Sequence, residues 1–455
     1  MEHAVNTICF YLYCLTGILT FIFVVVFLSG RSPVSFRTPF GKHDITYRPE
    51  RAAHGILLGR RSGLIAFSAE PDEGHVIVLG PSGTGKTSAL LIPTLRSWQG
   101  TALVVDISGD ISNNVHTPNK IVYAPAAADT VAYNVFAAVD SAETISDKNE
   151  RLEQLAFLLM PDSPNASEAS AFFTREGRKI LTAAFICYYH EGWGFVQICE
   201  FILSHDWRSL LNDIAEHKNE IANMNISSFA GANDQNNAGC KQSADAAIKL
   251  FATNGRIKNA LRKAENGENC ISPDTLETNS LYIYIEDSKL KLYSPLLRII
   301  TAQCMEYFSE RPKGNKNMIL FCLDEFASFG KLDIVEALRK LRKKHIRIMV
   351  LTQSLADLDL VYGKDERIAM LGNFKLKILL GCGDMETQEY FSKMIGDEKY
   401  FFARGDDEKD HPIIKPADLA HLGQDLYVLS DDGAVRLRKN YYFKKSTISF
   451  ITGKQ

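Results

Sequence analysis

The sequence predicts an α/β fold that is interrupted by an all-α segment and preceded by one apolar transmembrane helix. Three observations lead to this prediction. The motif G-x-x-x-x-G-K-[ST] stands between a short apolar run and a helical pattern. From Ser141 to Leu276, apolar residues recur at helical spacing. Near the N-terminus, Ile8 to Leu28 contains 21 residues and no charge.

Composition sets broad limits on the kind of protein. With 455 residues, of which 46% are hydrophobic and 23% charged, the chain has room for two or three ordinary globular domains. The net charge of −3 gives no overall signature of nucleic-acid binding, so any basic surface must be local. The nine cysteines contain no C-x-x-C pair, which suggests neither a zinc site nor a disulfide framework and fits a reducing compartment.

The charge-free run from Ile8 to Leu28 is long enough to cross a bilayer as a helix. A cleaved signal peptide is disfavoured because no Lys or Arg precedes the run, the run is too long, and no A-x-A site follows. Arg31, Arg37 and Lys42 follow it, which orients the rest of the chain toward the cytoplasm. We expect residues 1–30 to be a single-pass anchor in the inner, cytoplasmic membrane.

Residues 31–140 are expected to form the first part of a nucleotide-binding domain. Residues 31–74, which include His54–Gly59, are expected to supply edge strands. His75–Leu79 is typical of a short buried strand, and Thr87–Trp98 of a helix. The phosphate-binding motif therefore stands in the strand–loop–helix context that it requires.

The loop itself indicates a binding site for ATP and Mg²⁺. The expected contact residues are Gly80, Pro81, Ser82, Gly83, Thr84, Gly85, Lys86, Thr87 and Ser88. Gly83 and Gly85 let the backbone turn its N–H groups toward phosphate oxygens, and the following helix adds its positive N-terminal end. Lys86 is expected to reach the β- and γ-phosphates, and the Thr87 hydroxyl to coordinate Mg²⁺.

A second strand, Ala102–Val105, ends at Asp106, where α/β nucleotide folds place chemistry. A catalytic role and a turn role for Asp106 both remain open. Residues 141–276 are expected to form an all-α domain, because polar breaks separate its helical patterns and strand-like alternation is scarce. It contains no catalytic constellation, and His190 and His205 are interpreted as surface or loop histidines.

Residues 277–455 are expected to form the second part of the nucleotide-binding domain. Strand texture returns at Leu281–Ile285, and Met318–Leu323 runs directly into Asp324 and Glu325. An apolar strand that ends in two acids is the Walker B arrangement. Asp324 is expected to hold the Mg²⁺ shell and Glu325 to polarise the attacking water. The alternative is a capping pair for the helix that begins near Lys331.

The polar face and the end of this helix, which is expected over Lys331 to His345, carry a basic run: Arg339, Lys340, Arg342, Lys343, Lys344 and Arg347. Three interpretations are open: a solvated helix end favoured by the helix dipole, an arginine finger acting on a neighbouring subunit, and a contact to DNA phosphates. The next strand, Ile348–Leu351, leads to Gln353. A glutamine beside the Walker B strand is suited to sensing the γ-phosphate.

In their order and sequence, these motifs resemble the type IV secretion coupling proteins, the TraG/TraD-like ATPases of conjugative DNA transfer. The matching stretches are the N-terminal anchor, His54–Gly59, Gly80–Gly100, Asp106-x-x-Gly109-Asp110, Leu323–Leu332, Leu351–Ser354 and the tail Lys415–Phe443. The resemblance covers most of residues 54–140 and 280–443 and is weak across the helical segment.

The resemblance implies a RecA-like P-loop NTPase domain with an inserted all-α domain, assembled as a homo-hexamer that binds ATP between subunits. The arginine that acts across the interface in that family precedes the glutamine by eleven residues, which is the position of Arg342 relative to Gln353. Two features depart from the family. Only one membrane helix is found where the family usually has two, and Asp106-Ile107-Ser108-Gly109-Asp110 lacks the lysine of the usual Asp-Pro-Lys-Gly-Glu.

The expected function is that of a membrane-anchored ATPase. It would receive a relaxase–DNA complex or a protein as its substrate. It would drive this substrate, with the DNA in single-stranded form, to the subunits of a type IV secretion channel. Two alternatives stay open at this point. One is an FtsK/HerA-like DNA translocase without a secretion system, and the other is a scaffold that binds ATP only to assemble.

Overall fold

The computed structural model describes residues 44–163, 166–264, 268–312, 314–315, 317–398 and 411–444. The anchor predicted at residues 8–28 lies outside these ranges. Within them, every helix is too short or too polar to cross a membrane.

In the described part of the chain, twelve strands form one mixed sheet in the order β1-β3-β2-β16-β15-β12-β4-β11-β10-β5-β9-β6. The strands are β1 (Thr46–Arg48), β2 (Gly55–Arg61), β3 (Leu64–Ala69), β4 (His75–Leu79), β5 (Thr101–Asp106), β6 (Lys120–Tyr123), β9 (Ser280–Tyr284), β10 (Ile319–Leu323), β11 (Ile346–Thr352), β12 (Phe374–Leu379), β15 (Asp425–Ser430) and β16 (Gly433–Arg438). The run from β12 to β6 is parallel. The strands from β1 to β15 pair antiparallel, which confirms the edge strands expected before the loop.

The central strands are buried on both faces, as their continuous apolar sequences require. Every residue of β4, β10 and β11 is buried. Alternate residues face two different cores: Val76 and Val78 lie in one, and Ile77 and Leu79 in the other. In the parallel register, Leu323 of β10 lies opposite Val105 of β5 and Val350 of β11. The carboxyl ends of these strands therefore meet at one edge.

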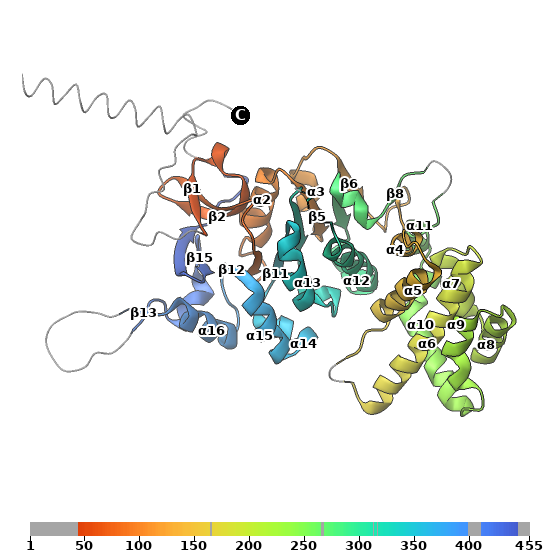
Figure 1. The fold of residues 1–455 in the computed structure, drawn as a ribbon. Coiled ribbons are helices and arrows are strands. Elements are labelled where there is room, and N and C mark those ends of the chain that lie inside the picture. The colour runs from red at the N-terminus through yellow and green to blue at the C-terminus, as the bar shows by residue number, and fades with distance from the viewer. Residues whose placement is uncertain are drawn as a thin grey trace, which may run out of the picture.

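Helices cover both faces of the sheet (Figure 1). One core contains buried residues of the helical turn η2 (Lys86–Leu91), α2 (Ile92–Ser97) and α3 (Asp110–Asn114). The other contains buried residues of α12 (Asp287–Ser309), α13 (Ile334–Leu341), α14 (Leu355–Tyr362), α15 (Lys364–Asn373) and α16 (Met385–Ile395). A separate hairpin of β13 (Asp397–Glu398) and β14 (His411–Pro412) follows α16.

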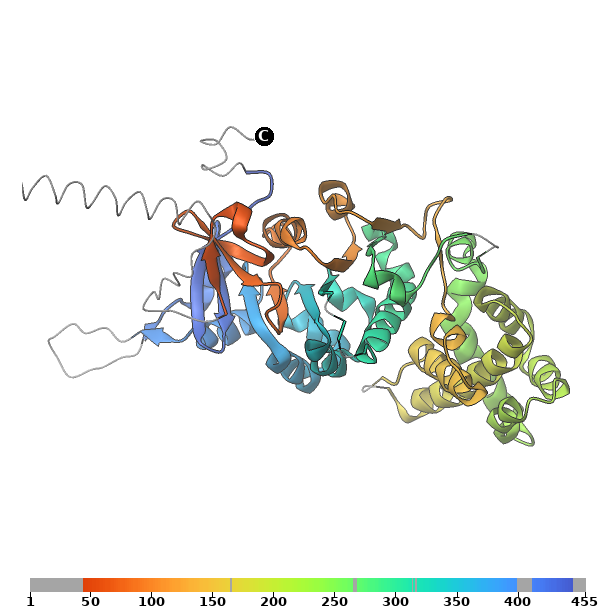
Figure 2. The ribbon, with the colours of Figure 1, turned by 45° about the horizontal axis from the view of Figure 1, so that its top comes forward.

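The segment predicted to be all-α, residues 141–276, is helical as far as Ala260, but its last part contains a short strand, Cys270–Ile271. The helices of this segment lie at one end of the molecule, away from β1 and β15 (Figures 1 and 2). Its helices are α5 (Ile145–Leu159), α6 (Glu168–His190), α7 (Phe195–Ser204), α8 (Trp207–Glu216), α9 (Glu220–Ile226), α10 (Asp234–Thr253) and α11 (Gly255–Ala260), preceded by the short α4 (Ala137–Asp140). The chain leaves after β7 (Ala132–Tyr133) and returns at β8 (Cys270–Ile271), and these two strands pair in parallel. The two ends of the helical segment therefore lie next to each other.

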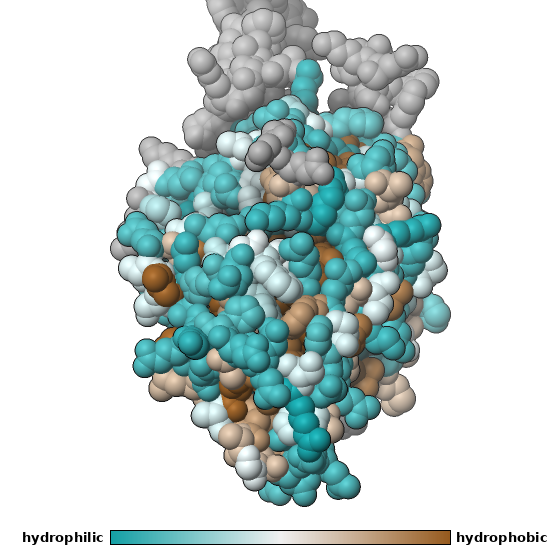
Figure 3. Space-filling view, turned by 90° about the vertical axis from the view of Figure 1, so that its right-hand side faces the viewer, coloured by the Kyte–Doolittle hydropathy of each residue, from teal (hydrophilic) through white to brown (hydrophobic). Residues whose placement is uncertain are grey.

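Side-chain contacts hold the helical segment against α12. Arg151 of α5 forms ion pairs with Glu306 at 2.8 Å and Glu310 at 2.7 Å. Arg298 of α12 donates to the carbonyl of Leu159 at 3.2 Å. The outer end of the segment is mostly hydrophilic, with scattered hydrophobic spots (Figure 3). Scattered apolar side chains of this kind are ordinary on a soluble surface.

His75, the first residue of β4, gives the fold a predicted dependence on pH. Its side chain is fully buried, with Nε2 2.8 Å from the carbonyl of Leu338 and Nδ1 3.0 Å from the amide of Ile348. Burial lowers its pKa from 6.5 to about 4. Because the unfolded chain binds this proton more readily, the neutral imidazole stabilises the fold above pH 6.5, and this stability is lost progressively as the pH falls toward 4.

We therefore expect the free energy of unfolding to fall by roughly 3 kcal/mol between pH 6.5 and pH 4 through this group. Urea titrations at several pH values measure it. His75→Gln, which removes the titration, is expected to flatten this part of the profile. An equally steep profile in the variant would assign the dependence to other groups.

Candidate nucleotide-binding site

The phosphate-binding loop joins β4 to η2 and adopts left-handed backbone conformations at two of its glycines. Gly83 has φ 79° and Gly85 φ 97°, both in the left-handed region. The Thr84 hydroxyl donates to the carbonyl of Pro81 at 2.7 Å. A Cβ at Gly80 would lie 2.6 Å from that hydroxyl oxygen. The loop therefore needs glycine at Gly80 for space and at the other two positions for backbone conformation.

The predicted helix Thr87–Trp98 forms, but its first part is wider than an α-helix. Residues Lys86–Leu91 form a π-helical turn, and the regular helix α2 begins only at Ile92. Pro93 follows at once and has no amide hydrogen with which to continue the regular ladder. Such π-helical turns occur frequently at functional sites.

Lys86 lies at the centre of the site and is buried. Its ammonium donates to the carbonyl of Gly80 at 2.7 Å and lies 3.5 Å from Oε1 of Glu325. The loop and the acidic end of β10 are thus joined by one lysine. A buried ammonium held by a single carbonyl and a nearby carboxylate has donors to spare for phosphate oxygens.

The oxygens of Asp324 and Thr87 lie close enough together to bind the same divalent cation. The Thr87 hydroxyl oxygen is 3.5 Å from Oδ2 of Asp324, and the aspartate is 8% exposed. Burial and the neighbouring Glu325 raise the pKa of Asp324 from 3.8 to about 6, although Lys86 opposes the rise. A buried carboxylate of this kind is destabilised when charged, and a bound cation relieves that cost.

The oxygen set fits Mg²⁺ held together with phosphate better than a metal held by protein alone. Among the residues that the structure describes, no cluster of three or more His, Cys, Asp or Glu side chains is arranged to bind a metal. Mg²⁺ is usually held by one or two carboxylates together with the phosphates of its substrate. Thr87 and Asp324 match that pattern.

Glu325 has a left-handed backbone, with φ 49° and ψ 44°, which is unusual for a residue with a side chain. Its Oε2 accepts a hydrogen bond of 3.2 Å from Nε2 of Gln353, which directly follows β11. The capping alternative for the acidic pair is wrong, because the helical turn η5 (Phe326–Phe329) intervenes and α13 begins only at Ile334. The structure therefore brings Lys86, Glu325 and Gln353 together.

Asp106 ends β5, the strand beside β10, but both of its oxygens are already engaged. Oδ1 accepts from the amide of Gly109 at 2.9 Å, and Oδ2 from the amide of Ser112 at 2.6 Å. The side chain is fully buried. Of the two open interpretations, the structural one therefore fits: Asp106 holds the turn into α3.

The residues of the basic run differ in their exposure and in the groups that they contact. Arg347 is 1% exposed and donates to the carbonyls of Gly74 and Ala69, so it holds the fold and cannot touch DNA. Lys344 donates to the carbonyl of Arg311 at 2.6 Å. The side chain of Arg342 is 54% exposed, and its Nε lies 3.8 Å from Oε2 of Glu73, which is 66% exposed. Sequence reasoning missed the burial of Arg347, although the apolar residues on both sides of it, in a strand that is buried throughout, indicate it.

Arg342 lies near the amino ends of the parallel strands, whereas the phosphate-binding loop lies at their carboxyl ends. It precedes β11, whereas Gln353 follows it. The seven residues of the strand separate the two by about 23 Å. Arg342 therefore cannot reach the nucleotide site of its own chain.

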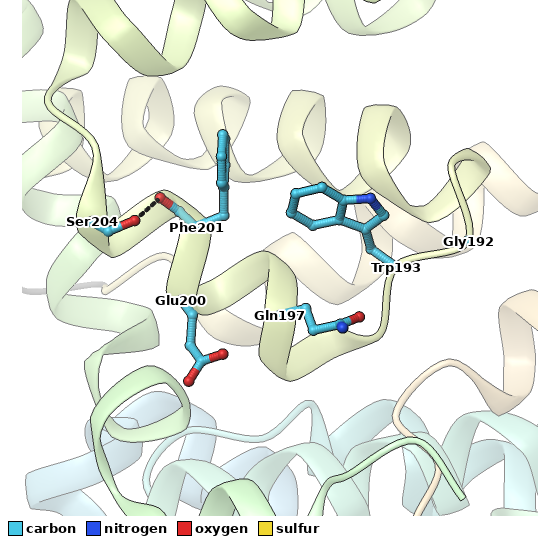
Figure 4. Close-up of a pocket in the computed structure, with 6 residues that line it drawn as sticks. All are labelled: Gly192, Trp193, Gln197, Glu200, Phe201 and Ser204. Carbon is cyan, nitrogen blue, oxygen red and sulfur yellow. Dashed lines mark hydrogen bonds between the residues drawn. The ribbon is translucent and has the colours of Figure 1, made fainter. Parts of the chain in front are cut away.

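A separate hollow of about 560 Å³ lies on the helical segment (Figure 4). It is lined by Gly192, Trp193, Gln197, Glu200, Phe201 and Ser204. Its Glu200 carboxylate is paired with Lys258, and the Ser204 hydroxyl donates to the carbonyl of Phe201 at 3.0 Å. These groups do not form a catalytic constellation, so the hollow is not an alternative candidate for the active site.

The strands, helices and phosphate-binding motif define an α/β NTPase fold with a large mixed sheet. The family model described as type IV secretory system conjugative DNA transfer matches residues 46–455. The chain belongs to this family.

Individual relatives are distant. The chain is 22% identical to the conjugal transfer protein TraG of Agrobacterium fabrum over 87% of its own length and 64% of the relative's. It is 23% identical to the protein VirD4 of Rhizobium radiobacter over 88% of its own length and 62% of the relative's. The chain thus spans somewhat less than two thirds of the length of these relatives.

Solved structures share the fold. The bacterial conjugative coupling protein TrwB, in an unbound form, matches with a TM-score of 0.69 and 18% identity over 87% of this chain and 89% of that one. TrwB in complex with ADP and Mg²⁺ matches with a TM-score of 0.67 and 19% identity over 82% of this chain and 86% of that one.

Proposed function

We propose that this chain is a membrane-anchored ATPase that couples a relaxase–DNA or protein substrate to a type IV secretion channel and drives its transfer by ATP hydrolysis. Membership of the conjugative DNA transfer family supports the biological role. The observation that carries the chemistry is the convergence of Lys86, Asp324, Glu325 and Gln353 at the carboxyl edge of the sheet.

In this proposal each residue has one task. The loop Gly80–Ser88 and Lys86 hold the phosphates of ATP, and Thr87 and Asp324 hold Mg²⁺. When bound, Mg²⁺ neutralises charge on the phosphates. Glu325 takes up the proton of the attacking water, and Gln353 fixes the Glu325 carboxylate in place. TrwB, which shares the fold, has been solved with ADP and Mg²⁺, in accord with this assignment.

The proposal includes a RecA-like motor domain, an inserted all-α domain and a homo-hexamer with ATP between subunits. The exposure of Arg342 and its distance from its own nucleotide site support a role on the ATP of a neighbour. The separate helical segment supports an inserted domain. The proposed partners, a relaxase and the subunits of a secretion channel, rest on family membership alone.

The experiment that tests the function is an ATPase assay on the full-length chain in mild detergent, with and without single-stranded DNA, at several salt concentrations. We expect DNA to stimulate hydrolysis and salt to weaken this stimulation, because phosphate contacts release counterions. Binding of ATP without hydrolysis, with or without DNA, would favour the scaffold. Stimulation by duplex DNA alone would favour a translocase of the FtsK/HerA kind.

The proposed anchor gives a prediction about localisation. Because Ile8 to Leu28 carries no charge over 21 residues, the full-length chain should sediment with membranes and resist extraction by high salt. A chain that begins at Gly30 should lose this attachment. Release of the full-length chain by a salt wash would leave only peripheral binding.

A further inference from the structure

The chain after β16 returns to the phosphate-binding loop, and its position is fixed by several contacts. The ammonium of Lys439 donates to the carbonyl of Gly423 at 2.8 Å. The buried Asn440 accepts from Arg60. The amide of Tyr442 donates to the carbonyl of Ser88 at 3.1 Å.

These contacts set the ring of Tyr441 against the loop. A Cβ built on Gly85 would lie 3.2 Å from Cε1 and 3.4 Å from the hydroxyl oxygen of Tyr441. The centre of the ring of the next residue, Tyr442, lies 5.0 Å from the guanidinium of Arg96, a residue of α2. Tyr441 is half-buried, and the next aromatic residue, Phe443, is 60% exposed.

The order of the strands shows which end of a bound nucleotide Tyr441 would meet. The loop follows β4, and the groups assigned to the γ-phosphate follow β10 and β11 on one side of that strand. Strands β12, β15 and β16 lie on the other side, and Tyr441 comes from there. If the γ-phosphate lies toward Glu325 and Gln353, the base and ribose must extend the opposite way. Tyr441 lies on that path.

We propose that Tyr441 forms the nucleoside subsite, with its ring packing against the base and ribose of a nucleoside triphosphate. This inference rests on the proposed function of the loop. A tyrosine ring offers an apolar face for stacking, and every base has a π-face to meet it. Lys444, whose ammonium lies 4.7 Å from the centre of the ring, is exposed and donates a hydrogen bond of 3.3 Å to Gln424. This bond is open to solvent, so the lysine can exchange it for water and move aside. Stacking makes no hydrogen bonds to the edge of the base and therefore does not distinguish adenine from guanine. ATP and GTP should bind with similar affinity.

The test measures binding by isothermal titration calorimetry on the full-length chain in mild detergent. The probes are MgATP, MgADP and inorganic tripolyphosphate, which carries phosphates without a nucleoside. Tyr441→Ala should weaken MgATP and MgADP by about tenfold while tripolyphosphate binds as before. Tyr441→Phe, which keeps the ring, should restore wild-type affinity. Tyr307→Ala, on the half-exposed part of α12, is the control for the loss of a tyrosine elsewhere and should change nothing.

The binding of tripolyphosphate also reports on folding, because a distorted loop would lose it in the Tyr441→Ala variant. Thermal melting provides a second check of folding. Unchanged or tighter binding of MgATP by a folded Tyr441→Ala variant would overturn the nucleoside subsite. Lys86→Ala tests the underlying function, since it should weaken MgATP and tripolyphosphate together. If Lys86→Ala changes neither, the proposed function fails; if only Tyr441→Ala is without effect, the subsite alone fails.

Discussion

Lys86→Ala is expected to weaken MgATP binding by about 10- to 100-fold, whereas Glu325→Gln should bind MgATP normally and lose hydrolysis by about 10²- to 10⁴-fold. The two effects differ because Lys86 meets phosphate in the ground state and Glu325 acts on the water. The Lys86 ammonium is buried between the loop and Glu325, so its removal leaves the site without its central positive charge. Calorimetry and a phosphate-release assay measure the two quantities.

The glutamine variant is a close match to the wild type. Its amide oxygen can still accept the hydrogen bond from Gln353, so the local geometry should survive. Gln353→Ala serves as a comparison that frees the Glu325 side chain without removing it, and a smaller loss of turnover is expected. Wild-type turnover in Glu325→Gln would show that another group is the base.

Arg342→Ala is expected to lower ATP turnover by about 10³- to 10⁵-fold while leaving ATP affinity nearly unchanged. An arginine finger stabilises charge that develops only in the transition state, so its loss appears in the rate and not in binding. The residue lies about 23 Å along β11 from its own site, so the effect must act on a neighbour. Turnover and the salt dependence of DNA binding are measured together.

Mixing experiments separate the finger from a DNA contact. Subunits carrying Arg342→Ala, mixed with subunits carrying Lys86→Ala, should regain part of the activity only if the finger acts across an interface. Lys343→Ala, the next residue in the same exposed turn, is the matched control for loss of charge and should keep turnover. Normal turnover of Arg342→Ala, with a salt slope for DNA binding reduced by about one unit, would assign Arg342 to the DNA.

Much of the sheet could be predicted because its strands are short, apolar and bounded by clear motifs. His75–Leu79 forms β4 with the predicted limits, and β10 and β11 differ from prediction by one or two residues at their ends. The pairing of β10 with β11, and hence the position of Gln353 beside Glu325, is confirmed. This geometry could be predicted because neighbouring parallel strands align their carboxyl ends, which brings together the residues that directly follow them.

Other parts of the site depend on contacts between distant residues, which periodicity does not reveal. Arg347 looked like one charge in a basic run, but its strand carries it into the interior, where carbonyls from the β3–β4 region receive it. Tyr441 reaches the loop only because β16 and β15 fold back beside β12. Three consecutive aromatic residues, Tyr441 to Phe443, were the only local signal. The membrane anchor, the hexamer and the catalytic roles stay predictions.

The left-handed backbone of Glu325 has a consequence for attempts to make this protein more robust. A residue with a side chain in this conformation costs roughly 1–2 kcal/mol relative to glycine, which adopts it freely. A random library selected only for heat resistance should therefore enrich Glu325→Gly. Each such variant would lack the carboxylate that is proposed to accept the proton of the attacking water, and it should not hydrolyse ATP. Thermostabilised variants therefore need a second selection for ATP turnover, because the residue that gives the highest stability at position 325 differs from the residue that supports hydrolysis.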